Sequence, residues 1–262
     1  MIKLLTIILV AMISLSTACS PIEESSKTGK EENQSESRIE EIDGVQMLLD
    51  AKAKLEALDG FYTVTEGATV SVGISQSILA KRIVSEGAVF KQSVSYSFMI
   101  KTASQTLAKD GKYFLKKSER VNSLTDIVWQ KAVSELTREQ YLEKFGSVNR
   151  GLSNFIITEQ TIKSAEVISE EDFFAVTVIL DCQTSTEYIA REMKFNSGSS
   201  ELPTFQSVTL TAQIYKNGTI KSIRYQHEYK IKMPVLGKVS CKEDTTESFY
   251  ELTDDEQISQ YF

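Results

Sequence analysis

One histidine, His227, is the residue in this sequence with the clearest capacity for chemistry. It lies in a stretch that alternates apolar and polar residues, so in a strand it would share a face with Tyr225 and Tyr229. An imidazole between two phenols can act as a polar point in a ligand cavity or as a general base. More often, such a residue is a neutral histidine that is hydrogen-bonded among aromatic rings. The spacing leaves these interpretations open.

Other groups that catalysis or metal binding would need are missing. One histidine and three cysteines are too few soft ligands for most zinc or iron–sulfur sites. The sequence has no glycine-rich phosphate loop and no serine-nucleophile motif. The formal net charge of −7, without a basic patch, argues against nucleic-acid binding. We therefore expect a binding protein and not an enzyme, with no catalytic residue, no metal and no cofactor.

The aromatic residues can line a cavity or simply fill a core. A curved sheet that is backed by few helices often leaves its concave face incompletely covered, and apolar pockets are the usual ligand sites. The candidate ligand-binding residues are Tyr225, His227, Tyr229 and Trp129. The candidate ligand is a lipid or another apolar molecule.

The first eighteen residues have the pattern of a signal peptide. Lys3 provides a positive charge, and the apolar run from Leu4 to Leu15 is shorter than the roughly 20 residues that span a bilayer. The small residues Ser16, Thr17 and Ala18 follow this run. Residues 1–18 are therefore expected to direct export.

Cys19 comes directly after these small residues, and this order resembles the lipobox of bacterial lipoproteins. The resemblance implies that Cys19 becomes the N-terminus, carries acyl chains such as palmitate, and anchors the protein at the extracytoplasmic face of the cell membrane. Ser16 departs from the pattern, which usually has Leu there. Ser16 and Ala18 also fit ordinary signal peptidase, and that cleavage would release a secreted protein.

Cys19 and the polar residues after it, 19–43, are expected to form a lipidated Cys and a flexible acidic tether. Residues 20–43 contain eight acidic and three basic side chains and few apolar ones, so they cannot bury enough surface to offset the entropy of ordering. Cys182 and Cys241 then remain as an even pair. They could form a disulfide, or they could be two free buried thiols.

The folded domain is expected to span residues 44–262. Apolar spacing predicts a helix over 44–59, with Asp43 as its N-cap, and strict alternation then predicts one long strand over about 61–75. Thr137 and Thr184 each begin a capping-box pattern for a short helix.

Further strands are predicted along the rest of the domain. Asn217-Gly218 predicts a type I′ hairpin turn between two alternating strands. The last strand, about 239–250, is mostly polar and is expected at a sheet edge or open to solvent on both sides. The other expected strands are 84–92, 94–108, one from Tyr113, 127–131, 162–168 and 173–182. The whole pattern predicts an α+β fold: a long curved antiparallel sheet, a half-barrel, with an N-terminal helix and a few short helices on one face.

The order of helix, long strands, middle helix and further strands resembles the LolA-type and LppX-type lipoprotein carriers. The likeness covers about residues 45–252 and implies a single LolA/LppX-like domain that holds acyl chains on the concave side of its sheet. Several segments are also similar to uncharacterised lipoproteins of Gram-positive anaerobes. They are Tyr188-x-x-Arg191-Glu192-Met193, Pro203-x-Phe205-x-Ser207-Val208, Ile214-x-x-Asn217-Gly218, Glu228-Tyr229, and Cys241 ahead of Thr246-Glu247-x-Phe249.

Two functions therefore compete. The first is a membrane-anchored module that binds a lipid or another apolar ligand in the concave face of the sheet. The second is a cell-surface module with a filled core that binds a protein or the cell wall through an exposed strand edge. An empty apolar volume on the concave face would distinguish the first from the second.

Overall fold

The helix expected after Asp43 opens the described part of the chain. In the computed structural model, α1 spans Gly44–Glu56. The Asp43 carboxylate accepts hydrogen bonds from the backbone N–H groups of Val45 and Gln46 at 2.9 and 3.1 Å. These bonds satisfy two of the four amide donors that a helix start leaves open. The buried face of α1 packs against four strands, β8 to β11.

The structure describes most of the chain after the tether. The described residues are 43–85, 87–97, 101–148, 150–152, 154–233, 237–253 and 258–261, all within the unit Glu41–Phe262. The expected signal peptide, Cys19 and all of the tether before Asp43 lie outside these ranges. Among the described helices, none combines the length and the hydropathy that a membrane span requires.

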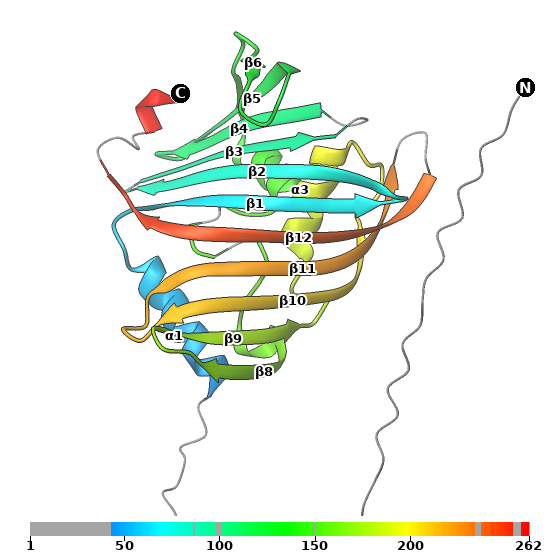
Figure 1. Cartoon of the computed structure of the whole chain (residues 1–262). Coiled ribbons are helices and arrows are strands. Elements are labelled where there is room, and N and C mark those ends of the chain that lie inside the picture. The colour runs from blue at the N-terminus through cyan, green and yellow to red at the C-terminus, as the bar shows by residue number, and fades with distance from the viewer. Residues whose placement is uncertain are drawn as a thin grey trace, which may run out of the picture. The chain divides into compact units, whose positions relative to one another are not determined.

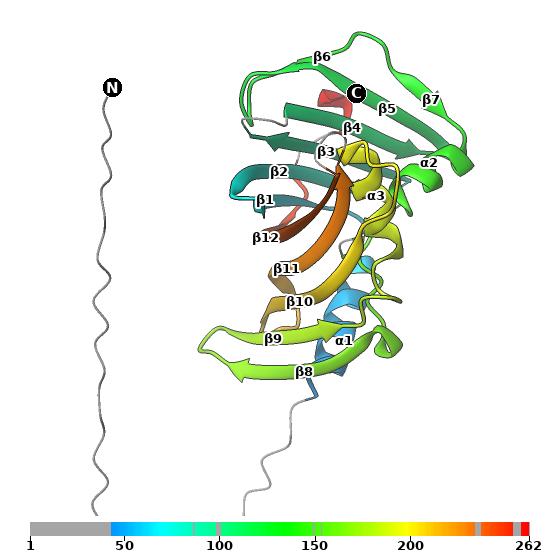
Figure 2. The ribbon, with the colours of Figure 1, turned by 90° about the vertical axis from the view of Figure 1, so that its right-hand side faces the viewer.

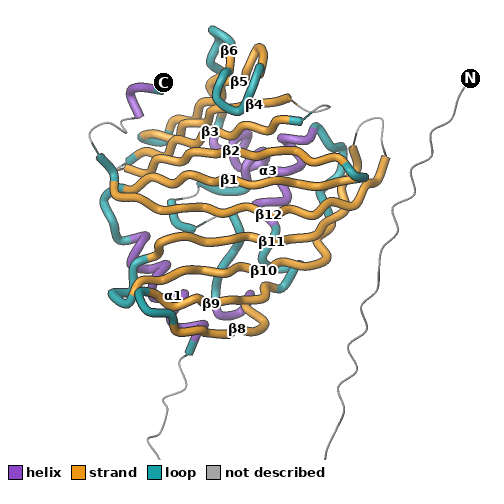
Figure 3. Tube along the Cα trace, viewed as in Figure 1, coloured by secondary structure: helices purple, strands orange, loops and turns teal. Residues whose placement is uncertain are grey.

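The strands of the described residues form one antiparallel sheet (Figures 1 and 3). Across the sheet they run β6-β5-β4-β3-β2-β1-β12-β11-β10-β9-β8, and β7 pairs with β5, so the sheet does not close into a barrel. Their bounds are β1 Phe61–Ser71, β2 Ile74–Ser85, β3 Ala88–Tyr96, β4 Lys101–Lys109, β5 Lys112–Val121, β6 Ile127–Trp129, β7 Ser134–Leu136, β8 Ile162–Ser169, β9 Phe173–Leu180, β10 Thr204–Tyr215, β11 Ile220–Met233 and β12 Gly237–Glu251.

The three α-helices of the described residues lie on one side of this curved sheet (Figure 2). Besides α1 they are α2, Arg138–Phe145, and α3, Glu187–Ser197. Short 3₁₀ helices occupy Glu159–Thr161 and Ile258–Gln260. The α+β half-barrel class that the sequence predicts is therefore confirmed.

The predicted long strand 61–75 is wrong, because the chain reverses at Val72 and Gly73. Both residues have positive φ, 50° and 77°, as the two central residues of a type I′ turn require. A β-branched Val gives no turn signal in a sequence, so the alternation hides the turn. The expected strand 84–92 likewise spans the end of β2 and the start of β3.

β12 is a central strand, which corrects the prediction that it lies at an edge. It pairs with β1 on one side and β11 on the other. Val239, Cys241, Thr245 and Glu247 alternate as buried residues along it. The polar members of this row misled the prediction, because they face a pocket and not bulk solvent.

Two local predictions also need correction. In the β10–β11 hairpin only Gly218 has positive φ, and its N–H donates to the Tyr215 carbonyl at 2.7 Å, so the turn is not type I′. The helix α3 has Thr186 and not Thr184 as its N-cap, because the Thr184 hydroxyl donates to Asp181 at 3.1 Å. The Thr137 capping box is confirmed.

Candidate ligand-binding pocket

A pocket of about 490 Å³ lies between the helix-covered face of the sheet and α3. Its size falls within the range of roughly 300 to 1,000 Å³ that is usual for small-molecule sites. Strands β1, β2, β3, β11 and β12 form its floor. The pocket reaches the β1–β2 turn, where Val72 is 75% exposed, so it is open to solvent at that end.

Strand periodicity determines which residues line the pocket. Side chains two apart share a face, so the odd-numbered residues of β1, β11 and β12 point inward. The two-residue turn between β1 and β2 then places the even-numbered residues of β2 on the same face. The apolar members at the open end of the pocket are Val72, Ile74, Ile231, Met233 and Val239.

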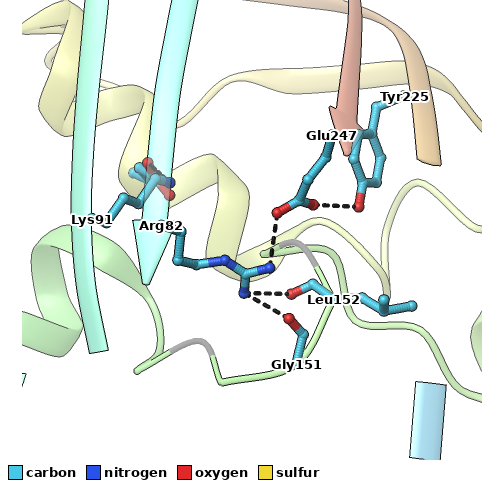
Figure 4. Close-up of polar contacts among 7 residues, drawn as sticks. Arg82, Lys91, Gly151, Leu152, Tyr225 and Glu247 are labelled. Atoms are coloured by element: carbon cyan, nitrogen blue, oxygen red, sulfur yellow. Dashed lines mark hydrogen bonds and ion pairs between the residues drawn. The ribbon is translucent and has the colours of Figure 1, made fainter. Parts of the chain in front are cut away.

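A buried ion pair lies at the opposite end of the pocket (Figure 4). Arg82 Nη2 on β2 lies 2.8 Å from Glu247 Oε1 on β12, and the two side chains are 5% and 6% exposed. The Tyr225 hydroxyl donates to the other Glu247 oxygen at 2.9 Å. Thus side chains from three strands, β2, β11 and β12, form one polar network at the end of the pocket that lies opposite its apolar opening.

Arg82 also fastens a loop over this end of the pocket. Its Nη1 donates to the carbonyls of Gly151 and Leu152 at 2.6 and 3.3 Å. A guanidinium can hold several acceptors at once because its donors form a rigid planar fork. A buried charge pair is stable only when its remaining groups are satisfied in this way.

A second ion pair connects α3 to the sheet. Lys91 on β3 pairs with Glu192 on α3, whose side chain is 8% exposed. The Asn154 amide donates to the other Glu192 oxygen, and the Ser147 hydroxyl donates to Asn154 at 3.1 Å. This chain of contacts holds α3 above the sheet and so keeps the pocket between them.

His227 lies in the pocket wall without a hydrogen-bond partner. It is 4% exposed, and neither ring nitrogen has a partner among the described residues. Aromatic rings surround it: the ring centroids of Phe155, Phe205 and Tyr229 lie 5.5, 5.6 and 5.6 Å away. A buried polar group without a partner costs about 1–3 kcal/mol, so His227 is a candidate for contact with a ligand in the pocket.

Glu243 lies on the neighbouring strand, β12, directly opposite His227 on β11. His227 Nε2 lies 3.6 Å from Glu243 Oε2, and the Thr69 hydroxyl donates to that same oxygen at 2.9 Å. Burial alone would raise the pKa of the Glu243 carboxyl, but His227, Thr69 and Lys91 together hold this pKa below its ordinary value. Glu243 is therefore ionised at neutral pH.

Three of the four predicted ligand-binding residues, Tyr225, His227 and Tyr229, lie together in the pocket wall. Burial, followed by the charge of Glu243, raises the pKa of Tyr229, so its phenol stays protonated. Trp129 does not join them. It packs with Val94, on the face of β3 opposite to the pocket.

The two cysteines of the folded unit are separate. Cys241 is buried on β12 in the pocket, whereas Cys182 is half-buried in the turn after β9, and both are free thiols. Burial raises the pKa of the Cys182 thiol. Of the two alternatives that the sequence leaves open, the structure has the free thiols.

The sequence patterns do not single out the charged residues of the pocket. Arg82, Glu243 and Glu247 appear in the sequence as ordinary polar members of alternating strands. The register of Val239 and Cys241 could have revealed the two glutamates, because both continue that row at spacings of two. No group of three metal-ligating side chains that could hold an ion occurs within the described ranges.

Comparisons with known proteins place few limits on this chain. No family model and no curated protein matches its sequence. Among solved structures, the fold is similar to the crystal structure of a DUF1329 family protein from Desulfovibrio piger. That match has 12% sequence identity, covers 84% of this chain and 98% of the other, and has a TM-score of 0.26. A likeness at this level assigns neither a family nor a function.

Proposed function

We propose that this protein is a membrane-anchored, extracytoplasmic lipoprotein that binds a lipid or another apolar ligand in the pocket between its sheet and α3. The role is binding and not catalysis. The observation that supports the proposal most directly is the open pocket of about 490 Å³ on the helix-covered face. A module with a filled core would not keep such a volume.

Apolar side chains at the open end of the pocket make it suited to a hydrocarbon chain. Burial of apolar surface contributes about 25 cal/mol per Å², and the mouth offers Ile74, Ile231 and Met233 for that contact. The buried polar end can orient a ligand by its head group. An amphiphile with a single chain therefore matches the pocket along its length.

The anchoring part of the proposal depends on the sequence of residues 1–43. A leader with a short apolar core, Cys19 and an acidic tether are together what an anchored lipoprotein needs. Labelled palmitate should be incorporated into the wild-type protein in growing cells and not into Cys19→Ala. Release of an unlabelled soluble wild-type protein would support ordinary signal-peptidase cleavage and exclude the anchor.

Mass spectrometry of the extracted native protein tests the ligand-binding part. We expect a co-purifying apolar molecule in the wild-type protein. Ile78→Trp should lose it, because Ile78 lines the pocket and the larger ring would fill that space. Val70→Trp is the matched control, because Val70 lies on the opposite face of the sheet and is 47% exposed.

The alternative function gives a different result in the same experiment. A wild-type protein that carries no apolar molecule and binds none when one is offered would contradict the proposal. Equal ligand content in Ile78→Trp and in Val70→Trp would place the ligand outside the pocket. Either result would favour the cell-surface interaction module.

A further inference from the structure

In the pocket, two polar side chains, those of Glu243 and His227, lie close together without a direct hydrogen bond between them. Glu243 Oε2 lies 3.6 Å from His227 Nε2, which is too far for a direct hydrogen bond. Both His227 nitrogens lack partners, and the Glu243 side chain is 17% exposed where it lines the pocket. Within the described ranges, the other Glu243 oxygen, Oε1, receives no hydrogen bond.

The other charges of the pocket are already neutralised. Arg82 pairs with Glu247, and Lys91 pairs with Glu192. Glu243 is the remaining acidic side chain, so among the lining residues the carboxylates outnumber the Lys and Arg side chains by one. An anionic group at this position would be repelled by Glu243 in surroundings where few water molecules can screen the charges.

One oxygen atom can bridge the two side chains. A hydroxyl that lies beside the pair, on the pocket side, can donate to the Glu243 carboxylate and accept from the imidazole N–H, each at about 2.8 Å. An ammonium group has donors only, so it fits this pair only where the ring nitrogen is the unprotonated one, and it would also lose its hydration on entering the pocket. A carboxylate has acceptors only and would face the Glu243 charge.

We infer that the ligand is an amphiphile with an uncharged hydroxyl head, which Glu243 and His227 hold together, and that the pocket rejects the corresponding carboxylate. This inference rests on the proposed function, because it assumes that the pocket binds an apolar ligand. It adds the chemical class of the head group. The apolar chain then extends toward Val72 and Met233 at the open end.

Three ligands with the same chain and different heads test the inference: dodecanol, dodecanoate and dodecylamine. Each would displace a neutral fluorescent dye, N-phenyl-naphthylamine, from the full-length protein at neutral pH. A hydrogen bond to a charged group is worth about 1.5–3 kcal/mol, so we expect dodecanol to bind roughly tenfold or more tightly than dodecanoate.

Glu243→Gln removes the charge and keeps the shape of the side chain. It should bring the affinities for dodecanol and dodecanoate within about threefold of each other, because the repulsion of the carboxylate is lost. Asp244→Asn is the matched control. It makes the same change in charge one residue along β12, on the outer face where Asp244 is 48% exposed, and it should leave the wild-type ratio unchanged.

The possible failures are distinguishable. If dodecanoate or dodecylamine binds as tightly as dodecanol, or if Glu243→Gln keeps the wild-type ratio, the head-group inference is overturned while the proposed function stands. If none of the three displaces the dye, the proposed function fails and the inference fails with it. The ranking on the wild-type protein decides the matter even if Glu243→Gln does not fold.

Discussion

Arg82 shows how a single residue can support the pocket. Its guanidinium joins β2 to Glu247 on β12 and to two loop carbonyls. It also lies over the Phe61 ring, with 5.5 Å between Cζ and the ring centroid. The Arg82–Glu247 pair is buried, so the free energy gained from its Coulombic attraction is largely offset by the cost of desolvation. Its main effect is therefore to fix the positions of the strands and the loop that it joins.

We therefore predict that Arg82→Met lowers the free energy of unfolding by about 3–5 kcal/mol, because it leaves Glu247 and two carbonyls buried without their cation. Urea denaturation measures this loss. Arg224→Met is the control, since the Arg224–Asp244 pair is 53% and 48% exposed and should contribute less than about 1 kcal/mol. Equal losses in the two variants would contradict the structural role of Arg82.

Glu243 predicts a pH dependence of stability. Its pKa is lower in the folded chain than in the unfolded chain, so the ionised carboxylate stabilises the fold. This contribution is complete above the unfolded pKa of about 4.3 and is lost as the pH falls through the lower folded value. The free energy of unfolding of the wild-type protein should therefore approach that of Glu243→Gln as the pH falls through the folded pKa of Glu243. A gap that widens on acidification would argue against this environment for Glu243.

At the scale of elements, the β1–β2 turn combines strain with exposure. Val72 has φ of 50°, which is unfavourable for a β-branched residue, and it is 75% exposed at the mouth of the pocket. Backbone strain of this kind is common at functional sites. Under the proposed function, a valine there provides apolar contact area for a ligand, at the expense of turn stability.

Val72→Asn tests this trade-off. Asn-Gly is the preferred pair for a type I′ turn, so the variant should be about 1 kcal/mol more stable than the wild-type protein. It should also bind an apolar ligand more weakly, because the mouth loses an apolar side chain. Thermal denaturation and dye binding measure the two effects. A variant that is both less stable and tighter-binding would show that this description of the turn is wrong.

Local patterns predicted elements well and their arrangement less well. The Asp43 cap, the Thr137 capping box and the alternation of β11 depend on residues near in sequence, so they could be recognised. The central position of β12 depends on its pairing with β1, which is distant in the chain. The sequence alone could place His227, Tyr225 and Tyr229 on one face of a strand. Glu243 and Arg82 join them in the pocket only because of the register in which the strands pair, which local sequence does not reveal.

At the scale of the whole folded unit, the pocket follows from an open sheet that is covered on one side. The sheet has unpaired edges at β6 and β8 in the described residues, and α3 is held to it by the Lys91–Glu192 pair. The apolar core under α1 is well filled, with Leu48, Val176 and Ile223 each at most 1% exposed. The pocket of about 490 Å³ lies on the part of the sheet below α3.

Methionine positions allow a direct measurement of ligand binding in this volume. Met193 and Met233 line the pocket, whereas Met47 on α1 packs against the same hydrophobic core without lining the pocket. In NMR spectra of the full-length protein with labelled methionine methyl groups, added dodecanol should shift the Met193 and Met233 signals and leave that of Met47 unchanged. Binding that moves Met47 and leaves the other two signals in place would contradict a ligand site between the sheet and α3.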